Sequence, residues 1–567
     1  MARINIAGAF LVALLICNSG VAETRCEYDA DGNVTRESYF GVDGKPEADK
    51  DGIFEVRREY DKAGKMIRGA KIYAVAGVKP TREDGIAEER REYDADGNVT
   101  RESYFSLDGK PKADKDGIFE VRREYDKAGK VIRGVRIYAV AGVKPTREDG
   151  IAEVRDEYDE NGNVARVAFF GVDGKPKADK YGVFEGRTEC DKAGKLIRIA
   201  MIYAVAGVKP TCEDGIAEIR YEYDADGNVT RESYFGLDGK PKADKNGVFE
   251  VRTEYGKDGK QKGKTLIYAV AGVKPTREDG IAEERAEFDE NGNLTKISYF
   301  DLDGKPTLCL PIGCAEIRHE YDKRGNRIRE SYFGVDGKPT AAHYKIRIDA
   351  NVFGGGLSTA VFNAIERGEK KGFEIVPGNK TTESGSNAEG IVVVEMKNVA
   401  EIRNEYDDHG NRTRVSMWGI DGKPAANSLG IAEVRFEYDA DGNVTRESYF
   451  GLDGKPKADK NGIFEVRYEY DKAGKVIRGA QIYAVTGVKP TREDGIAEER
   501  VEFDENGNVT RESYFGLDGK PKADKNGIFE IRWEYDKDGN MTKTSYFGVD
   551  GKPVGFNEEG EGVSPSP

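Results

Sequence analysis

Polar and apolar residues alternate along most of this chain in short runs that meet at clusters of Asp, Gly and Asn. In one representative stretch, residues 86–93 alternate in polarity, residues 94–98 form a polar cluster, and residues 99–105 alternate again. Two alternating runs around such a cluster predict a β-hairpin whose turn takes a positive φ at Gly97 or Asn98. Each strand offers only two or three apolar side chains, so we expect neighbouring hairpins to stack on one another.

The alternation also assigns the side chains of the second strand to two faces of the sheet. We predict that one face carries Val99, Arg101, Ser103 and Phe105. The opposite face is predicted to carry Thr100, Glu102 and Tyr104.

The hairpin pattern repeats through the chain. A Tyr or Phe just before the turn returns about every 32–33 residues, from Tyr28 to Tyr535, with one interruption between Tyr321 and Tyr406. Two kinds of second strand alternate, Val-Thr-Arg-Glu-Ser-Tyr-Phe and a more apolar one as at residues 131–137, so we predict a structural period of two hairpins, about 65 residues. The sequence therefore predicts an all-β fold: tandem β-hairpin repeats forming an extended twisted or superhelical sheet, with one small α/β insert.

The repeat divides the chain into five predicted segments. They are a signal peptide at 1–22, a first block of hairpin repeats at 23–340, an α/β insert at 341–398, a second block at 399–554 and a flexible acidic tail at 555–567. Within the insert we predict strands at residues 344–349, 373–376 and 391–396, and a helix from Ser358 to about residue 371. The three glycines at 354–356 indicate either a linker or an anion site at the start of that helix.

The N-terminal segment predicts the compartment. Arg3 precedes an apolar run at residues 4–17 that is too short to cross a bilayer, and the small residues Gly20 and Ala22 follow. This pattern predicts a signal peptide cut after Ala22, and the alternative is a buried N-terminal helix. No later run is apolar enough to span a membrane, so we expect an exported protein that is secreted, held at the cell surface or kept in the periplasm.

The charge pattern argues against a nucleic-acid-binding class. The formal net charge is -15, 34% of the residues are charged, and acids and bases share the same short stretches. A nucleic-acid interface would be basic and clustered, so we expect no nucleic-acid partner.

Catalytic, metal and cofactor sites are not predicted. The three histidines, His319, His343 and His409, are scattered and fit surface positions better than a triad or a metal site. The Asp-x-Asp-Gly-Asn turns resemble part of a calcium loop, but Ser38 stands where the acidic twelfth ligand should be, one residue past Glu37. A hairpin turn explains these residues, with weak calcium binding as the alternative. We therefore predict that the chain is not an enzyme.

Five cysteines follow the predicted signal peptide. Cys309 and Cys314 stand in a turn that elsewhere reads Lys-Ala-Asp-Lys-Asn-Gly, and in an exported protein we predict a disulfide between them. Cys190 and Cys212 are a second candidate pair, which leaves Cys26 over.

The hairpin tips resemble a known repeat family. The sequence Tyr-Asp-x-x-Gly-Asn-Val-Thr, at residues 93–100 and 438–445, is similar to the YD repeats of the RHS family of bacterial surface and toxin-associated proteins. The resemblance covers about eight residues of each unit, and the Asp-Gly-Lys-Pro segment is not part of the YD pattern. The resemblance implies an array of β-strands and, in the large members of the family, a hollow shell around a toxin; no C-terminal toxin domain is recognised in this sequence.

These patterns predict an exported repeat scaffold or binding protein that presents a repetitive surface to an extracellular protein or a polysaccharide. The residues predicted to bind on the repeat face are Arg36, Tyr39, Phe40, Arg101, Tyr104 and Phe105, with cross-strand packing as the alternative role. Two other hypotheses remain open. One is a small-ligand receptor or enzyme housed in residues 341–398, and the other is an RHS-like encapsulating shell.

Overall fold

The computed structural model describes residues 21–212, 214–310, 312–349, 373–377, 391–459, 461–556 and 562–563. The predicted signal peptide, the glycines at 354–356 and the helix from Ser358 therefore lie outside the described residues or almost entirely so. The chain divides into two compact units, Met1–Tyr255 and Gly256–Pro567, which are described in turn.

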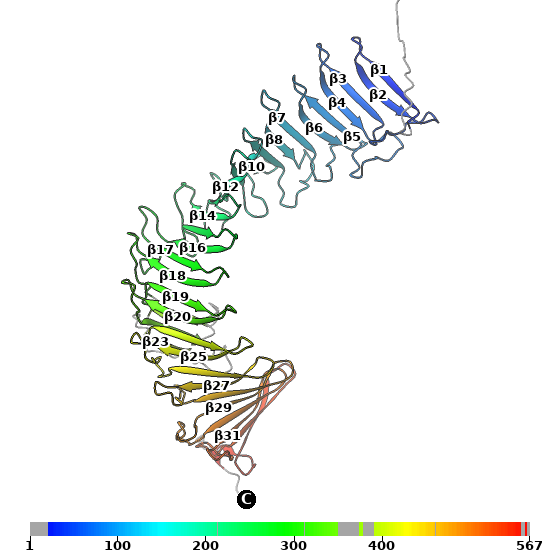
Figure 1. Ribbon diagram of the computed structural model, residues 1–567. Coiled ribbons are helices and arrows are strands. Elements are labelled where there is room, and N and C mark those ends of the chain that lie inside the picture. The colour runs from blue at the N-terminus through cyan, green and yellow to red at the C-terminus, as the bar shows by residue number, and fades with distance from the viewer. Residues whose placement is uncertain are drawn as a thin grey trace, which may run out of the picture. The chain divides into compact units, whose positions relative to one another are not determined.

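The first unit is a run of antiparallel hairpins (Figure 1). Its strands are β1 (Glu23–Tyr28), β2 (Val34–Phe40), β3 (Glu55–Tyr60), β4 (Met66–Ile72), β5 (Glu88–Tyr93), β6 (Val99–Phe105), β7 (Glu120–Tyr125), β8 (Val131–Ile137), β9 (Glu153–Tyr158), β10 (Val164–Phe170), β11 (Glu185–Cys190), β12 (Leu196–Ile202), β13 (Glu218–Tyr223), β14 (Val229–Phe235) and β15 (Glu250–Tyr255). Each strand pairs with its neighbours in chain order.

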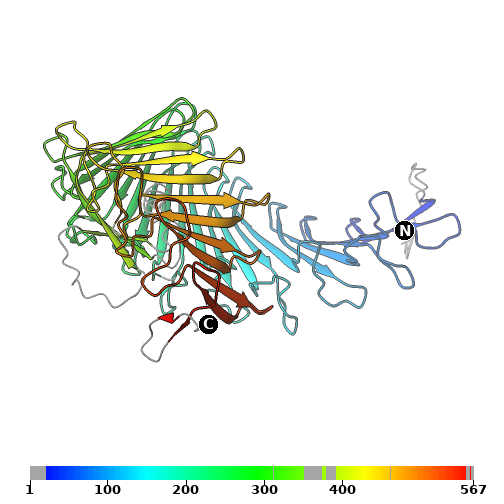
Figure 2. The same ribbon diagram turned by 90° about the horizontal axis from the view of Figure 1, so that it is seen from below.

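The second unit continues the same plan (Figure 2). Its repeat strands are β16 (Gln261–Ile267), β17 (Glu283–Phe288), β18 (Leu294–Phe300), β19 (Glu316–Tyr321), β20 (Arg327–Phe333), β24 (Glu401–Tyr406), β25 (Arg412–Trp418), β26 (Glu433–Tyr438), β27 (Val444–Phe450), β28 (Glu465–Tyr470), β29 (Val476–Ile482), β30 (Glu498–Phe503), β31 (Val509–Phe515), β32 (Glu530–Tyr535) and β33 (Met541–Phe547). A short hairpin, β34 (Gly555–Phe556) with β35 (Gly562–Val563), follows. The described residues contain no helix, and the all-β repeat prediction is confirmed.

Three strands of the second unit form a separate sheet between β20 and β24. They are β21 (Ala342–Asp349), β22 (Phe373–Pro377) and β23 (Ile391–Val399), antiparallel in the order β22–β21–β23. Val399 and Met396 are buried in the same core cluster as Val415 and Met417 of β25. The end of this small sheet is thereby packed against the repeat core.

Most hairpin tips are fixed by one aspartate and one glycine. At the tip between β5 and β6, the Asp94 carboxylate accepts hydrogen bonds from the backbone N–H of Asp96 and of Asn98, both at 2.9 Å. Gly97 takes the positive φ, 88°, and its N–H donates to the Asp94 carbonyl at 3.1 Å. The Asn98 side chain also donates to Asp94, and these bonds lower the pKa of Asp94. The turn residues are therefore occupied in holding the turn.

A β-bulge follows each tip and changes which side chains share a face. Arg101 pairs with Glu92, but Val99 pairs with Tyr93, so Thr100 is an extra residue on its strand. The Thr100 hydroxyl donates to the Glu92 carbonyl at 3.2 Å. The prediction that Val99 shares a face with Arg101 is therefore wrong, because the bulge restarts the alternation between the two residues.

Two kinds of strand junction alternate, which makes four strands the structural repeat of the first unit. Strands β2 and β3 pair over three residues, from Arg36 to Ser38, whereas β4 and β5 pair over five, from Arg68 to Ile72. The core is built at the junctions between hairpins, where Ile53, Tyr73, Ile86 and Tyr104 form one cluster. Each hairpin buries few side chains by itself, so its stability depends on its neighbours.

Candidate binding face of the repeats

One face of each sheet is covered by alternating arginines and glutamates, and we call it the Arg–Glu face. It is the face that carries Arg36, Arg101 and the residues paired directly with them across the strands. Arg101 on β6 forms ion pairs with Glu120 on β7 at 2.6 Å and with Glu92 on β5 at 3.4 Å. Glu120 also pairs with Arg122 of its own strand at 2.5 Å. Glu92 lies directly opposite Arg101, whereas Glu120 lies diagonally from it, opposite Ser103.

The same ion pair recurs at the three-residue junctions of the first unit and at three such junctions of the second. The arginines are Arg36, Arg101, Arg166, Arg231, Arg414, Arg446 and Arg511, and their partners are Glu55, Glu120, Glu185, Glu250, Glu433, Glu465 and Glu530. Burial by itself would raise the pKa of Glu120, but the hydrogen bonds from Arg101 and Arg122 outweigh it and the pKa lies below its usual value. Glu120 is therefore held ionised between two guanidinium groups.

The aromatic residues on this face lie beneath arginines. The Arg90 guanidinium carbon lies 4.0 Å from the centre of the Phe105 ring, and Arg25 lies 4.1 Å from that of Phe40. Trp418 takes the same position under Arg403 at 4.0 Å. In each pair the guanidinium group lies over the face of the ring, which is a cation–π contact.

Three hollows open at equivalent positions of the repeats. The first, about 460 Å³, is lined by Arg57, Arg68, Arg90 and Arg101 together with Glu59, Glu88, Glu92 and Phe105. The second, about 480 Å³, lies one four-strand repeat later and has Arg122, Arg133 and Arg155 in the places of Arg57, Arg68 and Arg90. The third, about 350 Å³, lies in the second unit and contains Arg467, Arg478 and Arg500. All three offer guanidinium donors and carboxylate acceptors side by side.

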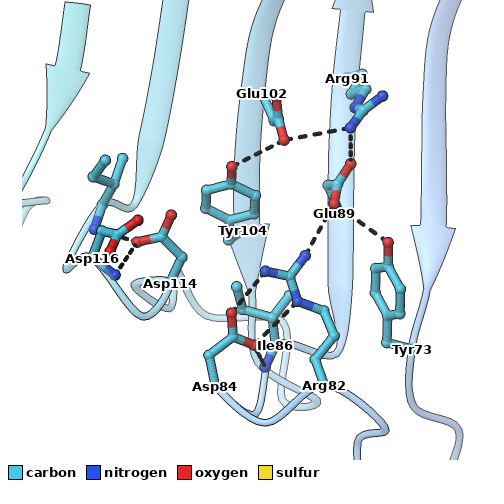
Figure 3. A network of polar contacts seen from close by, with 11 residues as sticks. Tyr73, Arg82, Asp84, Ile86, Glu89, Arg91, Glu102, Tyr104, Asp114 and Asp116 are labelled. Atoms are coloured by element: carbon cyan, nitrogen blue, oxygen red, sulfur yellow. Dashed lines mark hydrogen bonds and ion pairs between the residues drawn. The ribbon is translucent and has the colours of Figure 1, made fainter. Parts of the chain in front are cut away.

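The opposite face carries a buried polar network instead (Figure 3). It joins Tyr73, Arg82, Asp84, Glu89, Arg91, Glu102 and Tyr104. Glu89 is only 4% exposed and lies 3.1 Å from Arg82 and 2.7 Å from Arg91. Arg82 also pairs with Asp84 at 2.7 Å, which ties the loop before β5 to the sheet.

The network varies between repeats. Arg492 repeats the contacts of Arg82, with Asp494 and Glu499 both at 2.8 Å. In the third repeat Cys212 stands in the place of Arg82, and Ile219 stands in the place of Glu89. In the second repeat Arg147 keeps its pair with Asp149 at 2.6 Å, although Val154 stands in the place of Glu89. The arginine can therefore hold its loop aspartate without the buried glutamate.

The structure divides the residues predicted to bind on the repeat face between the two faces. Arg36 and Arg101 lie on the Arg–Glu face with their side chains 43% and 42% exposed, and Phe40 and Phe105 lie there under arginines. Tyr39 and Tyr104 turn to the opposite face, where Tyr104 is 7% exposed and Tyr39 packs against the core. The residues predicted to bind included no individual glutamate and left out the second set of arginines on the Arg–Glu face. Their signal was the Glu-x-Arg spacing that opens most first strands, as at Glu55 and Arg57.

The cysteines predicted to form a disulfide face each other across a tight turn. The Cys309 N–H donates to the Cys314 carbonyl at 2.8 Å, and both side chains are buried. Both are thiols in this structure, and burial raises the pKa of Cys314 to about 12. The disulfide stays a prediction.

The remaining chemical candidates are structural where they are described. His319 is buried, with its Nε2 at 3.2 Å from Glu330 and its Nδ1 at 3.0 Å from the Leu294 carbonyl, while His409 is exposed at a hairpin tip. Among the described residues, no group of three or more His, Cys, Asp or Glu side chains is arranged to hold a metal ion. No helix in the described part of the chain is long and apolar enough to cross a bilayer.

Comparisons with known proteins give structural matches only. No protein-family model matches the chain, and no curated protein matches it. Among solved structures, it aligns with a TcdB2–TccC3–TEV complex at 13% identity and TM-score 0.20, and with the Photorhabdus luminescens Tc holotoxin pore carrying a TccC3 mutation at 13% identity and TM-score 0.22. Each alignment covers 95% of this chain and 26% of the other, so the chain spans about a quarter of the proteins it matches. Scores this low carry no argument beyond the fold described above.

Proposed function

We propose that this protein is an exported repeat scaffold that binds an extended extracellular polysaccharide along its Arg–Glu face. The observation that carries the proposal is the return of the same hollow in consecutive repeats, with Arg57, Arg68 and Arg90 in one and Arg122, Arg133 and Arg155 in the next. A polymer with a regular repeat is the partner that matches a regular row of sites.

The side chains of the hollows favour a hydroxyl-rich ligand over a strongly charged one. Guanidinium groups only donate hydrogen bonds and carboxylates only accept them, so an Arg–Glu pair can hold both sides of a hydroxyl group. The arginines are already neutralised by glutamates, and the net charge of -15 opposes the approach of a polyanion. Phe105 and Phe170 add apolar ring edges to the first two hollows.

The spacing of the hollows supports binding at several points. Four strands separate equivalent residues, and strands lie roughly 4.8 Å apart, so the first two hollows are about 19 Å from each other. One ligand that reaches both gains an effective concentration for the second contact without any new kind of contact. Individually weak sites can therefore give firm attachment.

The proposal also includes the family relationship of the protein and its export from the cytoplasm. We infer an RHS-like relationship from the Tyr-Asp-x-x-Gly-Asn tips, and export from the signal-peptide pattern at residues 1–22. The proposal assigns the chain no catalytic step. A receptor or enzyme site in residues 341–398 remains a separate hypothesis.

The test replaces one exposed arginine in each hollow. Arg68, Arg133 and Arg478 are 62%, 61% and 59% exposed, and each pairs with an equally exposed glutamate, so the triple alanine variant should fold normally. We expect its binding to insoluble polysaccharides, measured by co-sedimentation, to weaken about tenfold or more, because each site loses charged hydrogen bonds.

The matched control removes three charges from exposed lysines in the turns. Lys45, Lys110 and Lys455 are each 80% exposed and lie away from the hollows. Their alanine variant should bind as the unchanged protein does. The proposal is wrong if no polysaccharide binds, or if the arginine variant and the lysine variant behave alike.

A further inference from the structure

The three-residue junctions, from the second strand of one hairpin to the first strand of the next, share one set of contacts. At the β2–β3 junction, Arg36 pairs with Glu55 at 2.6 Å and the Tyr60 hydroxyl donates to the Val34 carbonyl at 3.0 Å. The β6–β7 and β27–β28 junctions repeat both contacts, with ion pairs at 2.6 Å and tyrosine bonds at 2.8 Å. This junction therefore has two complementary halves, an Arg side and a Glu/Tyr side.

Strand β1 presents the Glu/Tyr half. Its pairing with β2 has the register of every other hairpin, which puts Glu23 in the place of Glu55 and Tyr28 in the place of Tyr60. The ion pair recorded for Glu23 is with Arg25 of its own strand, and Tyr28 is 47% exposed. Within the described residues, β1 pairs with β2 alone.

Strand β33 presents the Arg half. Its register with β32 puts Lys543 in the place of Arg36 and Met541 in the place of Val34. Lys543 pairs with Glu534 at 2.8 Å, as Arg36 pairs with Glu27, and Met541 is 59% exposed. Among the described strands, β32 is the one neighbour of β33.

We propose that β33 of one copy pairs with β1 of a second copy, through the contacts that join hairpins within the chain. The register of β2 with β3 places Lys543 opposite Arg25 of the second copy, Thr544 opposite Thr24 and Ser545 opposite Glu23. In that register Lys543 meets Glu23 as Arg36 meets Glu55, and Tyr28 meets the Met541 carbonyl. Edge strands usually carry charges that repel a partner, but these two edges are complementary.

The contact joins two different surfaces, so it is head-to-tail. Such a contact leaves one free edge at each end of a pair and continues into open chains unless the rotation closes a ring. Each added copy would extend the Arg–Glu face by another set of repeats. This inference does not depend on the identity of the ligand that the face binds.

Charge exchange at the two edges tests the inference. Glu23→Lys places two lysines at the contact, and Lys543→Glu places two glutamates there. For the unchanged protein we expect the average mass, measured by light scattering after gel filtration, to rise with concentration. Each single variant should associate at least about tenfold more weakly, because like charges then face each other.

Mixing the two variants distinguishes the contact from a general effect of charge. In the mixture every junction between unlike variants pairs a lysine with a glutamate, so association should return, although each variant alone associates only weakly. Lys552→Glu, which changes an exposed turn lysine by the same charge, should behave as the unchanged protein does. The inference is overturned if the unchanged protein stays monomeric at its highest soluble concentration, or if the single variants associate as well as it does.

Discussion

At the residue scale, the Arg–Glu face depends on carboxylates that stay ionised. Arginine partners hold the pKa of Glu120 and Glu185 below the usual value, against the opposite effect of burial. An acid whose folded pKa is depressed stabilises the fold above the unfolded pKa and loses that contribution as the pH falls. Glu499 behaves in the opposite sense, because burial raises its pKa and its contribution is lost as the pH rises.

We predict that the melting temperature falls as the pH is lowered from about 4.5, the ordinary value for glutamate, toward 2, near the pKa of Glu330. A variant with Gln at positions 120 and 185 should lose less over this range, because two of the titrating groups are gone. At pH 7 the same variant should melt at a lower temperature, because four arginines lose an anionic partner.

Glu499→Gln is the control for this titration. Glu499 is also a buried glutamate, but its contribution to stability is already complete below pH 4.5. The melting temperature of this variant should therefore still fall as the pH is lowered from 4.5 to 2. Thermal unfolding followed by circular dichroism at several pH values measures all three proteins. A melting temperature that does not change between pH 4.5 and 2 contradicts the ion-pair account.

At the scale of the elements, the hairpins could be predicted from the sequence and the bulges could not. The Asp-Gly-Asn cluster fixes the position of each turn, and alternation fixes the strands on both sides. The Val-Thr-Arg sequence after the turn fits an uninterrupted strand as well as a bulged one, because side-chain polarity does not show that Thr100 is unpaired. Register decides which residues form a face, and register is set by turn geometry and by partners distant in the sequence.

The same reason explains which part of the candidate face was missed. Arg101 and Phe105 stand out in a single repeat, but Glu120 becomes their neighbour only when the next hairpin folds beside them. The volume of a hollow is likewise a property of four strands together. The predicted strands at 344–349, 373–376 and 391–396 correspond to β21, β22 and β23, and the helix predicted between them lies outside the described residues.

Alanine substitutions at two glycines should have opposite effects on the stability of the protein. Gly97 has a φ of 88° at the hairpin tip, where a side chain costs roughly 1–2 kcal/mol, so Gly97→Ala should destabilise the protein by about that amount. Gly69 lies within β4, and an added methyl would contact the Tyr93 ring at 3.6 Å, an ordinary contact distance.

Gly69→Ala should therefore leave stability unchanged or raise it slightly, because alanine loses less backbone entropy on folding. Urea unfolding followed by fluorescence compares the two variants with the unchanged protein. Equal destabilisation by both substitutions would show that the turn geometry is not what limits the hairpin.

At the scale of the whole molecule, the repeats matter because equivalent residues recur on the Arg–Glu face of each unit. A compact enzyme brings different residues to one place, whereas this chain brings equivalent residues to three hollows in its described repeats. Attachment should then be governed by how many sites one ligand reaches, and weak single sites are sufficient.

The measurement that tests this claim most directly is binding as a function of ligand length. A set of purified oligosaccharides from the polysaccharide that binds would be titrated into the full chain by calorimetry. We predict weak binding for oligomers shorter than about 19 Å, and a sharp rise in apparent affinity once a ligand spans two hollows. Affinity that is the same for short and long oligomers would contradict the account, since it would place binding in a single site and leave the repetition without a role.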